Sequence, residues 1–318
     1  MNLSEVGFGA WAIGGQSYGK VERSESLRAL AKAEELGCNF VDTAFVYGDS
    51  ERVLGEFLPG RREKWLVATK YSGQKAGMAA TVEEQLRRLK IDTIDFYQIH
   101  WTPLEGEKHL YEALYQLKRS GKVRFIGVSL YTEDDIDYVL DHTEVDGIQV
   151  SFSLLDPDPY LARLERIRQK KIGVVIRSCL KEGFLTGKFT REATFPDPND
   201  QRHKWSRNEI NGTVQSVERF RFLEKEAGSL LIAAARYPLS FPETSTVILG
   251  TKSAAQAEVN FGKVPGGVLS DHHLDAIRST QKKLVLRSRF SFFGILKRRA
   301  SGLLRTVGQR KVVSSKKG

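Results

Sequence analysis

The fold is decided by residues 65–129, which read WLVATKYSGQKAGMAATVEEQLRRLKIDTIDFYQIHWTPLEGEKHLYEALYQLKRSGKVRFIGVS. Three runs in this stretch have the length and the β-branched and aromatic content of buried strands, at 65–70, 93–100 and 123–129. Between them, apolar residues recur at helical spacing, first at Val82, Leu86 and Leu89 and then at Leu110, Leu114 and Leu117. Strict alternation of strand and helix predicts parallel strands joined by right-handed crossovers.

The same alternation continues in both directions and gives eight strand-like runs in all. They lie at 5–11, 39–43, 65–70, 93–100, 123–129, 147–153, 173–178 and 246–250. Eight such units close into a ring, so we predict an α/β fold, a (β/α)8 TIM barrel. An open doubly wound sheet that binds a dinucleotide needs a glycine-rich loop after its first strand. The segment GFGAW at 7–11 lacks the third glycine of that loop.

Residues that begin and end helices support this reading. The predicted helix starts are the capping-box pair Thr81 and Glu84 and the N-caps Ser24, Thr132 and Ser253. The predicted helix ends are Gly37 and Gly121. Two regions interrupt the regular spacing, 188–213 and everything after 261. Long segments at the carboxyl ends of barrel strands usually shape a site.

The net charge of +10 is concentrated at the C-terminal end. No acidic residue follows Asp275, whereas 13 basic residues do, which leaves 36 basic and 39 acidic residues before that point. We therefore predict a barrel over 1–275 and a basic extension over 276–318, partly packed or flexible. The body is too nearly neutral for a nucleic-acid-binding face. Between 287 and 307 basic and apolar residues mix, so an anionic membrane surface or an acidic partner is an alternative to packing on the barrel.

Compartment and metal content are constrained by what the chain contains. The longest apolar runs, such as 230–235, are far shorter than the roughly 18–20 residues of a membrane-spanning helix, and no basic residue precedes Lys20 as in a secretory signal. We therefore expect a cytoplasmic protein. Cys38 and Cys179 are too few for a disulfide framework, and neither they nor the pair His272 and His273 have zinc-type spacing, so no metal is predicted.

Four polar residues follow consecutive predicted strands. Asp42 ends the second, Tyr47 lies five residues further on, Lys70 ends the third and His100 ends the fourth. Ends of neighbouring parallel strands meet at one rim, so these side chains can converge. Taken one at a time, these residues have simpler explanations. Asp42 and Lys70 could form a salt bridge at the barrel rim, Tyr47 could serve packing, and His100 could be a core residue with its hydrogen bonds satisfied.

Together these four suit hydride reduction of a carbonyl, which leaves negative charge on the oxygen. A tyrosine donates the proton, a lysine ammonium stabilises the phenolate that remains, and a carboxylate keeps a buried lysine charged. A neutral histidine donates a second hydrogen bond that orients the carbonyl.

At these residues the sequence resembles the aldo-keto reductase family, in its longer-loop bacterial and plant branch. The matching motifs cover nearly the whole chain and include VGFGAWAIGG (6–15), NFVDTAFVYGDSERVLG (39–55), EGFLTGKF (182–189) and STVILGTKSAAQAEVNFG (245–262). The resemblance implies that Asp42, Tyr47, Lys70 and His100 are the catalytic tetrad. It also implies NADPH bound across the carboxyl rim without a Rossmann unit.

The resemblance further assigns cofactor contacts residue by residue. Ser129 and Gln149 match nicotinamide-binding positions, and Ser253 and Lys252 match the adenosine end, where a helix N-terminus and a cation favour the 2′-phosphate of NADPH over NADH. The complete set implied is Gly9, Trp11, Asp42, Ser129, Gln149, Arg177, Ser178, Leu180, Gly183, Leu185, Lys188, Gly250, Lys252, Ser253, Gln256 and Asn260.

The sequence departs from the family pattern at several places. Leu130 stands where an asparagine usually follows Ser129, and Cys179 replaces a proline. Arg177 replaces an aromatic residue that covers the nicotinamide in many members. Its guanidinium can cover the ring, meet an anionic group or pair with a loop carboxylate. The first barrel strand begins close to residue 1, so we expect a barrel without the leading hairpin of the family.

We therefore predict an NADPH-dependent oxidoreductase that reduces an aldehyde, ketone or sugar carbonyl to an alcohol with Tyr47 as proton donor. The alternative is a cofactor-binding regulatory or redox-sensing protein with little turnover, because some proteins with this barrel keep the tetrad in that role. Three tryptophans suggest an apolar or sugar-stacking substrate wall, and rim packing explains them equally well: Trp11, Trp101 and Trp205.

Overall fold

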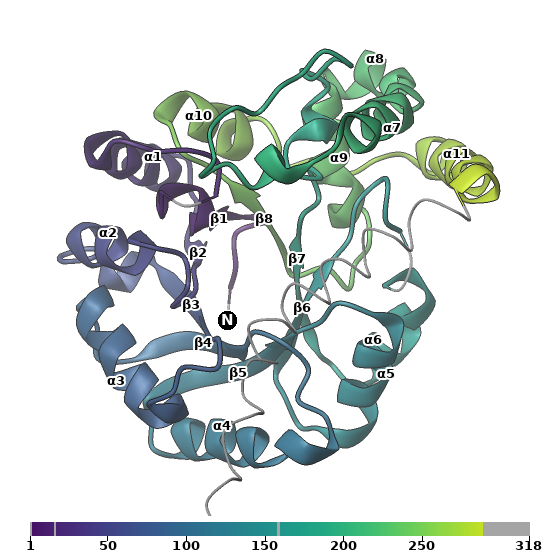
Figure 1. The fold of residues 1–318 in the computed structure, drawn as a ribbon. Coiled ribbons are helices and arrows are strands. Elements are labelled where there is room, and N and C mark those ends of the chain that lie inside the picture. Colours follow the sequence, from purple (N-terminus) through teal and green to yellow (C-terminus); the bar gives the residue numbers. More distant parts are fainter. Residues whose placement is uncertain (1, 16, 158–159, 289–318) are drawn as a thin grey trace, which may run out of the picture.

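Eight parallel strands close into a barrel in the order of the chain, as the sequence predicts (Figure 1). The computed structural model describes residues 2–15, 17–157 and 160–288. The strands are β1 (Val6–Gly9), β2 (Phe40–Asp42), β3 (Leu66–Tyr71), β4 (Ile94–Ile99), β5 (Val123–Ser129), β6 (Gly147–Ser151), β7 (Gly173–Arg177) and β8 (Thr246–Gly250). Closure is made by β8, which pairs with β1 from Val6 opposite Val247 to Gly9 opposite Gly250.

Helices surround the ring of strands (Figure 1). They are α1 (Arg23–Glu35), α2 (Ser50–Phe57), α3 (Gly77–Leu89), α4 (His109–Arg119), α5 (Glu133–His142), α6 (Leu164–Gln169), α7 (Arg207–Glu218), α8 (Glu224–Ala227), α9 (Leu230–Leu239), α10 (Ala254–Gly262) and α11 (Asp271–Ser288). Apolar residues of the outer strand faces and of the facing helices form one continuous buried cluster. The described helices include none long and apolar enough to cross a membrane.

Helix ends confirm part of the capping prediction. Thr132 caps α5 in a capping box with Asp135, and the Ser253 side chain accepts the Gln256 N–H at the start of α10. Left-handed glycines follow α1 and α4 as predicted, Gly37 with φ +85° and Gly121 with φ +74°.

Two predicted N-caps are wrong. Helix α3 already begins at Gly77, so Thr81 lies inside it and donates its hydroxyl hydrogen to the Gly77 carbonyl. Glu84 pairs with Arg87 and Arg88 instead of closing a capping box. Ser24 lies within α1, whose N-cap residue is Glu22.

Predicted strand ends also shift by up to two residues. The run expected at 5–11 leaves the sheet after Gly9 and continues as a 3₁₀ turn over Ala10–Ile13. The run expected at 147–153 ends at Ser151 because Ser153 turns back to pair with Asp156.

One aromatic ring in the barrel interior occupies a place where two strands lack side chains. Phe96 of β4 projects toward Gly127 of β5 and Gly147 of β6. A Cβ atom on Gly127 would overlap both the Phe96 ring and the Gly147 carbonyl oxygen. These glycines therefore make the space that Phe96 occupies with Phe40, Ala68 and Val175.

The irregular stretch that includes 188–206 connects β7 to α7 and returns across the start of the chain. The expected region 188–213 is therefore shorter, because α7 already begins at Arg207. Tyr18 and Asp200 form an antiparallel bridge, and the Gln201 N–H donates to the Ser17 carbonyl at 2.8 Å. The loop after β1 and the loop after β7 are thereby joined.

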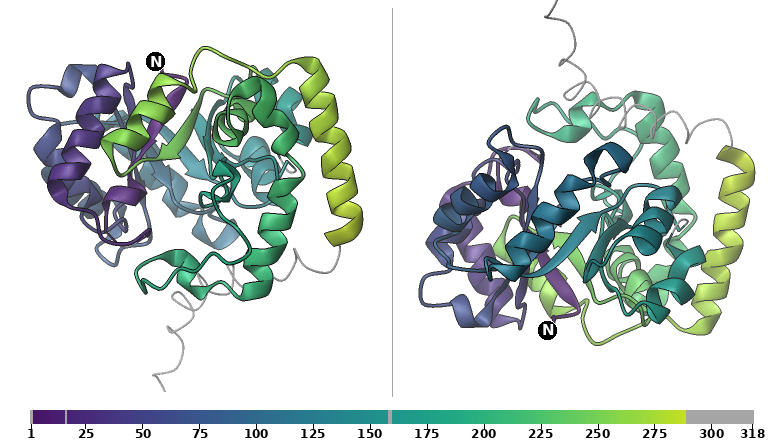
Figure 2. Two further views of the ribbon diagram at one scale, coloured as in Figure 1. Left: turned by 90° about the horizontal axis from the view of Figure 1, so that it is seen from above. Right: turned by 90° about the horizontal axis from the view of Figure 1, so that it is seen from below.

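Helix α11 runs along the outside of the molecule (Figure 2). Its Gln281 side chain donates to the Leu154 carbonyl and to the Tyr237 hydroxyl, which ties the helix to the barrel. The predicted boundary at residue 275 falls inside α11, and the predicted extension lies outside the described residues from 289 onward.

Candidate active site

A lysine and an aspartate form a buried ion pair between β2 and β3. Lys70 Nζ lies 2.5 Å from Asp42 Oδ2, and the two side chains are 0% and 2% exposed. The strand register explains this proximity, because Asp42 pairs with Ala68, two residues before Lys70. Lys70 Nζ also donates to the Thr43 carbonyl at 2.7 Å. A buried ammonium with a carboxylate and a carbonyl as acceptors is held in one orientation.

The second oxygen of Asp42 is held from the opposite wall of the barrel. Gln149 Nε2 of β6 donates to Asp42 Oδ1 at 2.8 Å, and Gln98 Nε2 of β4 donates at 3.3 Å. Sequence reasoning missed Gln98. The available signal was its place two residues before His100, since alternate residues of a strand share a face.

Tyr47 lies beside this pair in the loop between β2 and α2. Lys70 Nζ is 5.2 Å from the centroid of the Tyr47 ring. Burial, and next to it the charge of Asp42, raise the pKa of Tyr47 well above its usual value, so the phenol stays protonated. Burial also lowers the pKa of Lys70, and Asp42 opposes this shift.

The loop that carries Tyr47 rests on a glycine. A Cβ atom on Gly14 would overlap the Tyr47 carbonyl oxygen, so the chain after β1 can approach only where a side chain is missing. The Asp49 N–H donates to the Gly14 carbonyl at 3.3 Å and closes the contact.

His100 completes the group at the end of β4. Its ring meets the Tyr47 ring edge-on with 5.8 Å between centroids. Burial, followed by the charges of Lys70 and Arg177, lowers the pKa of His100 well below its usual 6.5, which leaves the imidazole neutral. The structure thus brings together all four residues proposed from sequence: Asp42, Tyr47, Lys70 and His100.

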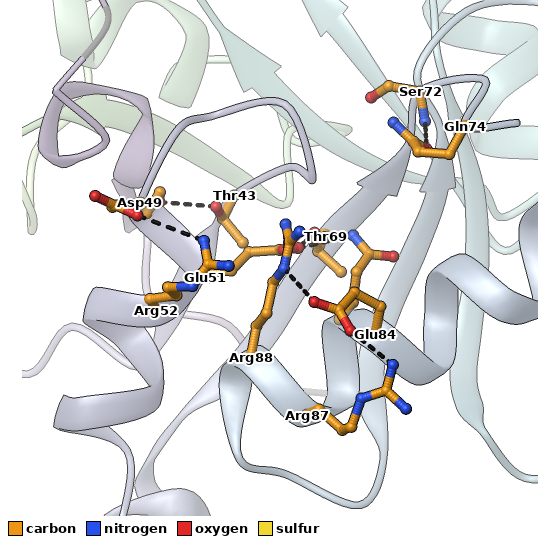
Figure 3. Close-up of polar contacts among 12 residues, drawn as sticks. Thr43, Asp49, Glu51, Arg52, Thr69, Ser72, Gln74, Glu84, Arg87 and Arg88 are labelled. Carbon is orange, nitrogen blue, oxygen red and sulfur yellow. Dashed lines mark hydrogen bonds and ion pairs between the residues drawn. The ribbon is translucent and has the colours of Figure 1, made fainter. Parts of the chain in front are cut away.

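A buried polar network of Glu51, Thr69 and Gln85 contacts the backbone of Lys70. Glu51 accepts hydrogen bonds from Thr69 and from Gln85, both at 2.7 Å, and Gln85 also donates to the Lys70 carbonyl at 3.2 Å. Figure 3 shows Glu51 and Thr69 at the centre of this region, with Arg88 beside them. Burial raises the pKa of Glu51.

Unpaired polar atoms line the wall next to Asp42. Ser129 ends β5 fully buried, and its hydroxyl is among the buried atoms without a hydrogen-bond partner in the described part of the chain. The side-chain amide oxygen of Gln98, Oε1, is another. Ser129 pairs in register with Gln149. A ligand amide placed here would satisfy the two unpaired atoms.

Arg177, at the end of β7, forms no ion pair within the described residues. Its Nη2 donates to the Leu130 carbonyl at 2.8 Å, and its guanidinium lies 4.5 Å from the ring centroid of Tyr131. Pairing of Arg177 with a loop carboxylate is therefore not seen among the described residues, which do not include Asp158 of the loop after β6. Arg177 Nε has no partner among these residues.

The loop after β7 carries the next group of predicted contacts. Ser178 adopts a left-handed conformation with φ +58°, and Gly183 with φ +87°. The Leu185 N–H donates to the Leu180 carbonyl at 3.1 Å, which makes the loop compact. Lys188 follows, and burial together with the neighbouring charges of Arg202 and Lys252 lowers its pKa.

The start of α10 is tightly bonded. The Lys252 N–H donates to Gln256 Oε1 at 2.9 Å, and Lys252 Nζ donates to the Tyr18 carbonyl at 3.0 Å. Asn260 donates to the Thr251 hydroxyl at 2.9 Å. The Ala254 N–H donates to a carboxylate oxygen of Glu25 at 3.0 Å, so an acidic side chain already occupies this helix start. Sequence reasoning missed Glu25, because α1 and α10 are far apart in the chain.

The three predicted substrate tryptophans lie in different surroundings. Trp11 is 5.8 Å from Tyr47 between ring centroids. Trp101 packs on Tyr71 and donates its indole N–H to Glu107 at 3.0 Å. Trp205 is stacked on the buried Phe184 ring at 5.1 Å, a contact that favours the rim-packing explanation for this residue.

Two further sequence expectations concern metal and thiol chemistry. The described residues contain no group of three or more His, Cys, Asp or Glu arranged to hold a metal ion. Cys38 and Cys179 are buried free thiols, and burial raises the pKa of each to about 12. Neither thiol is therefore primed for nucleophilic chemistry.

Comparisons with known proteins agree with this geometry. The profile of the Aldo/keto reductase family matches residues 5–282. The chain is 29% identical over 278 residues to the aldo-keto reductase YhdN of Bacillus subtilis, which covers 81% of this chain and 84% of that protein. It is 32% identical over 225 residues to an NADH-specific methylglyoxal reductase of Escherichia coli, covering 60% of this chain and 68% of that one. Among solved structures, a glycerol dehydrogenase from Gluconobacter oxydans superposes with a TM-score of 0.74 at 27% identity, covering 89% of this chain and 93% of the other.

Proposed function

Since the chain belongs to the aldo/keto reductase family of oxidoreductases, which act on small-molecule carbonyl compounds, we propose that it reduces an aldehyde, ketone or sugar carbonyl to an alcohol with NADPH. Tyr47 is the proton donor in this proposal. The observation that carries it is the buried Asp42–Lys70 pair beside the Tyr47 ring and the neutral His100.

The residues present fit a nicotinamide cofactor. The Ser129 hydroxyl and Gln98 Oε1, which have no partner among the described residues, suit a carboxamide, which both donates and accepts hydrogen bonds. Gln149 of β6 lies beside Ser129 in the sheet. Gly9 and Gly250 lie opposite each other where β1 meets β8 and carry no side chains, and Trp11 follows in the turn after β1. When bound, the cofactor supplies a hydride to the carbonyl carbon.

The phosphate groups would lie over the loop after β7 and the start of α10. Burial, followed by the charges of Arg202 and Lys252, lowers the pKa of Lys188, and a phosphate placed among the three cations would relieve their mutual repulsion. Ser178, Leu180, Gly183 and Leu185 supply the backbone of this loop, and Ser253, Gln256 and Asn260 shape the adenosine end.

Preference for NADPH over NADH is supported by Lys252 and opposed by Glu25. The carboxylate of Glu25 on the Ala254 N–H would repel a 2′-phosphate at that helix start, unless its contact with Arg28 draws it away. One relative of this chain is an NADH-specific methylglyoxal reductase, so the family match alone does not decide between NADPH and NADH. We propose NADPH because Lys252 directly precedes Ser253, the N-cap of α10, and so brings a cation to this helix start, where the Tyr18 carbonyl accepts a hydrogen bond from its Nζ.

Each catalytic side chain has one task. His100, neutral, donates a hydrogen bond to the substrate carbonyl oxygen, and Tyr47 gives that oxygen its phenolic proton as negative charge develops. The Lys70 ammonium stabilises the phenolate left behind, and Asp42 keeps the lysine charged and oriented. Trp11 and Trp101 would form apolar walls for the substrate, and Arg177 would cover the nicotinamide ring or meet an anionic group. A cytoplasmic location suits two buried thiols that are not joined.

The test is a fluorescence titration with NADPH and NADH, followed by turnover of a carbonyl panel. Wild type, Lys252→Ala and Glu25→Gln are compared, and the panel includes methylglyoxal and, in the oxidative direction, glycerol. We expect NADPH to bind more tightly than NADH, Lys252→Ala to weaken NADPH selectively and Glu25→Gln to strengthen it. Turnover should be abolished by Tyr47→Phe. Binding without turnover would favour the redox-sensing role instead, and equal binding of both cofactors would overturn the NADPH preference.

A further inference from the structure

The turn after β3 places a serine beside the imidazole of His100. Tyr71 pairs with Ile99 at the last position of the β3–β4 ladder, and the His100 N–H donates to the Tyr71 carbonyl at 2.9 Å. The next residue on β3's side, Ser72, therefore stands next to His100. Its hydroxyl oxygen lies 2.9 Å from His100 Nδ1.

Two contacts fix the position of Ser72. Gln74 Oε1 accepts the Ser72 N–H at 3.0 Å, which Figure 3 shows, and the Gln74 carbonyl accepts the Tyr71 hydroxyl hydrogen at 3.1 Å. The turn needs the left-handed Gly73 between them, with φ +80°. Ser72 is thus held by the backbone and not by its hydroxyl, whose only bond within the described residues is to His100.

His100 is held on every side except one. Its N–H is bonded to Tyr71, its carbonyl accepts the Tyr131 hydroxyl hydrogen at 3.2 Å, and Nδ1 faces Ser72. No described residue forms a hydrogen bond with Nε2, so this nitrogen is left for a ligand next to the Tyr47 ring. A neutral imidazole carries one proton, so the nitrogen that bears it decides whether Nε2 donates or accepts.

A carbonyl oxygen accepts hydrogen bonds and cannot donate one. The Nδ1–H tautomer would present the lone pair of Nε2 to that oxygen, and the Ser72 hydroxyl hydrogen would then have no acceptor among the described residues. The Nε2–H tautomer satisfies both places, because Ser72 then donates to Nδ1.

We propose that Ser72 is a positioning residue that donates to Nδ1 of His100 and so keeps the imidazole proton on Nε2, where it faces the substrate carbonyl. The role of Nε2–H in orienting the substrate carbonyl rests on the proposed function. The tautomer itself is a property of the protein without substrate and can be measured independently. No residue assigned from sequence performs this task.

The experiment is a long-range nitrogen–hydrogen correlation spectrum of the full chain labelled with 15N-histidine. The six histidines are few enough to resolve, and His100→Gln identifies the signal of interest. We expect the Nε2–H pattern in wild type and in Ser72→Thr, which keeps a hydroxyl, and a mixture of both tautomers in Ser72→Ala. Ser216→Ala is the matched control and should keep the wild-type pattern, because this partly buried serine of α7 donates its hydroxyl hydrogen to the Gly212 carbonyl of the same helix.

Kinetics with the best carbonyl substrate give the second readout. We expect kcat of Ser72→Ala to fall about tenfold, the factor that corresponds to one ordinary hydrogen bond, with KM within about twofold of wild type and near-full recovery in Ser72→Thr. A thermal melt verifies that each variant is folded. An Nδ1–H pattern in wild type, or an unchanged pattern in Ser72→Ala, overturns the proposal. Absence of any turnover in wild type would count against the proposed function and leave the spectroscopic result standing.

Discussion

Asp42 holds Lys70 with one carboxylate oxygen and Gln149 with the other, so a single side chain links three strands across the barrel interior. The ion pair is almost completely buried. Removing one member of such a pair costs more than removing both, because a lone buried charge remains.

Asp42→Asn should therefore lower the free energy of unfolding by about 3 kcal/mol, the scale for a broken buried pair, and kcat/KM by at least about a hundredfold. Urea unfolding and steady-state kinetics measure the two effects. The double variant Asp42→Asn/Lys70→Met should regain much of the stability and none of the activity. Equal destabilisation in the single and the double variant would contradict this account.

The acid limb of the pH dependence should reveal His100. Its folded-state pKa lies well below 6.5, so between that value and about 6.5 the unfolded chain binds more protons than the folded one. The free energy of unfolding should therefore decrease as the pH falls through this interval, and kcat/KM should stay level down to the lowered folded pKa.

His100→Gln supplies the control for that prediction. The variant should show a flatter stability curve below pH 6.5 and a lower, less pH-dependent kcat/KM. A wild-type acid limb centred at 6.5 or above, which His100→Gln removes, would show that the imidazole is not desolvated as the structure indicates.

Gly14→Ala should displace the loop that carries Tyr47. A methyl group cannot fit against the Tyr47 carbonyl oxygen, so we expect kcat to fall by about a hundredfold or more, in line with a misplaced proton donor. Gly212→Ala is the matched control, since this exposed glycine of α7 has open space around its Cα and should gain up to about 1 kcal/mol of helix stability. Wild-type kcat in Gly14→Ala would mean that the loop shifts without cost.

Gly127→Ala should destabilise the barrel by about 1–3 kcal/mol through overpacking against Phe96. Phe96→Leu in the same chain should relieve only part of this, because the added methyl also meets the Gly147 carbonyl oxygen. Denaturant unfolding of both variants and of Phe96→Leu alone completes the cycle. Full recovery in the double variant would assign the whole effect to the ring.

The order of strands and the convergence of the tetrad were predictable from sequence. Asp42, Lys70 and His100 each follow an apolar run of strand length, and parallel neighbours bring such ends to one rim. Alternate residues of a strand share a face, so the sequence pattern also places Gln98 on the face of His100, and Ser72 on the face of Lys70.

Other features depend on contacts that spacing does not encode. Gln149 reaches Asp42 across 107 residues, and its bond becomes visible only once the barrel is closed. Thr81 is a residue type that often caps helices, but α3 begins one turn earlier, at Gly77. The Thr81 hydroxyl therefore donates to the Gly77 carbonyl within the helix. The same limit applies to Glu25, whose bond to Ala254 exists only because α1 and α10 lie side by side (Figure 1).

The tetrad side chains all follow β2, β3 or β4, whereas most positions matched to the cofactor follow β5 to β8. Under the proposed function, the front half of the chain would carry proton transfer and the back half most of the dinucleotide contacts, with the Asp42–Gln149 hydrogen bond as a link between them. Recombination with another barrel at a seam between α4 and β5 would then exchange most cofactor contacts and keep the tetrad, provided that the new half also supplies a glutamine at the position of Gln149. For protein engineering, and for the divergence of such barrels by gene fusion, coenzyme choice and acid–base chemistry would be separable traits except at this one bond.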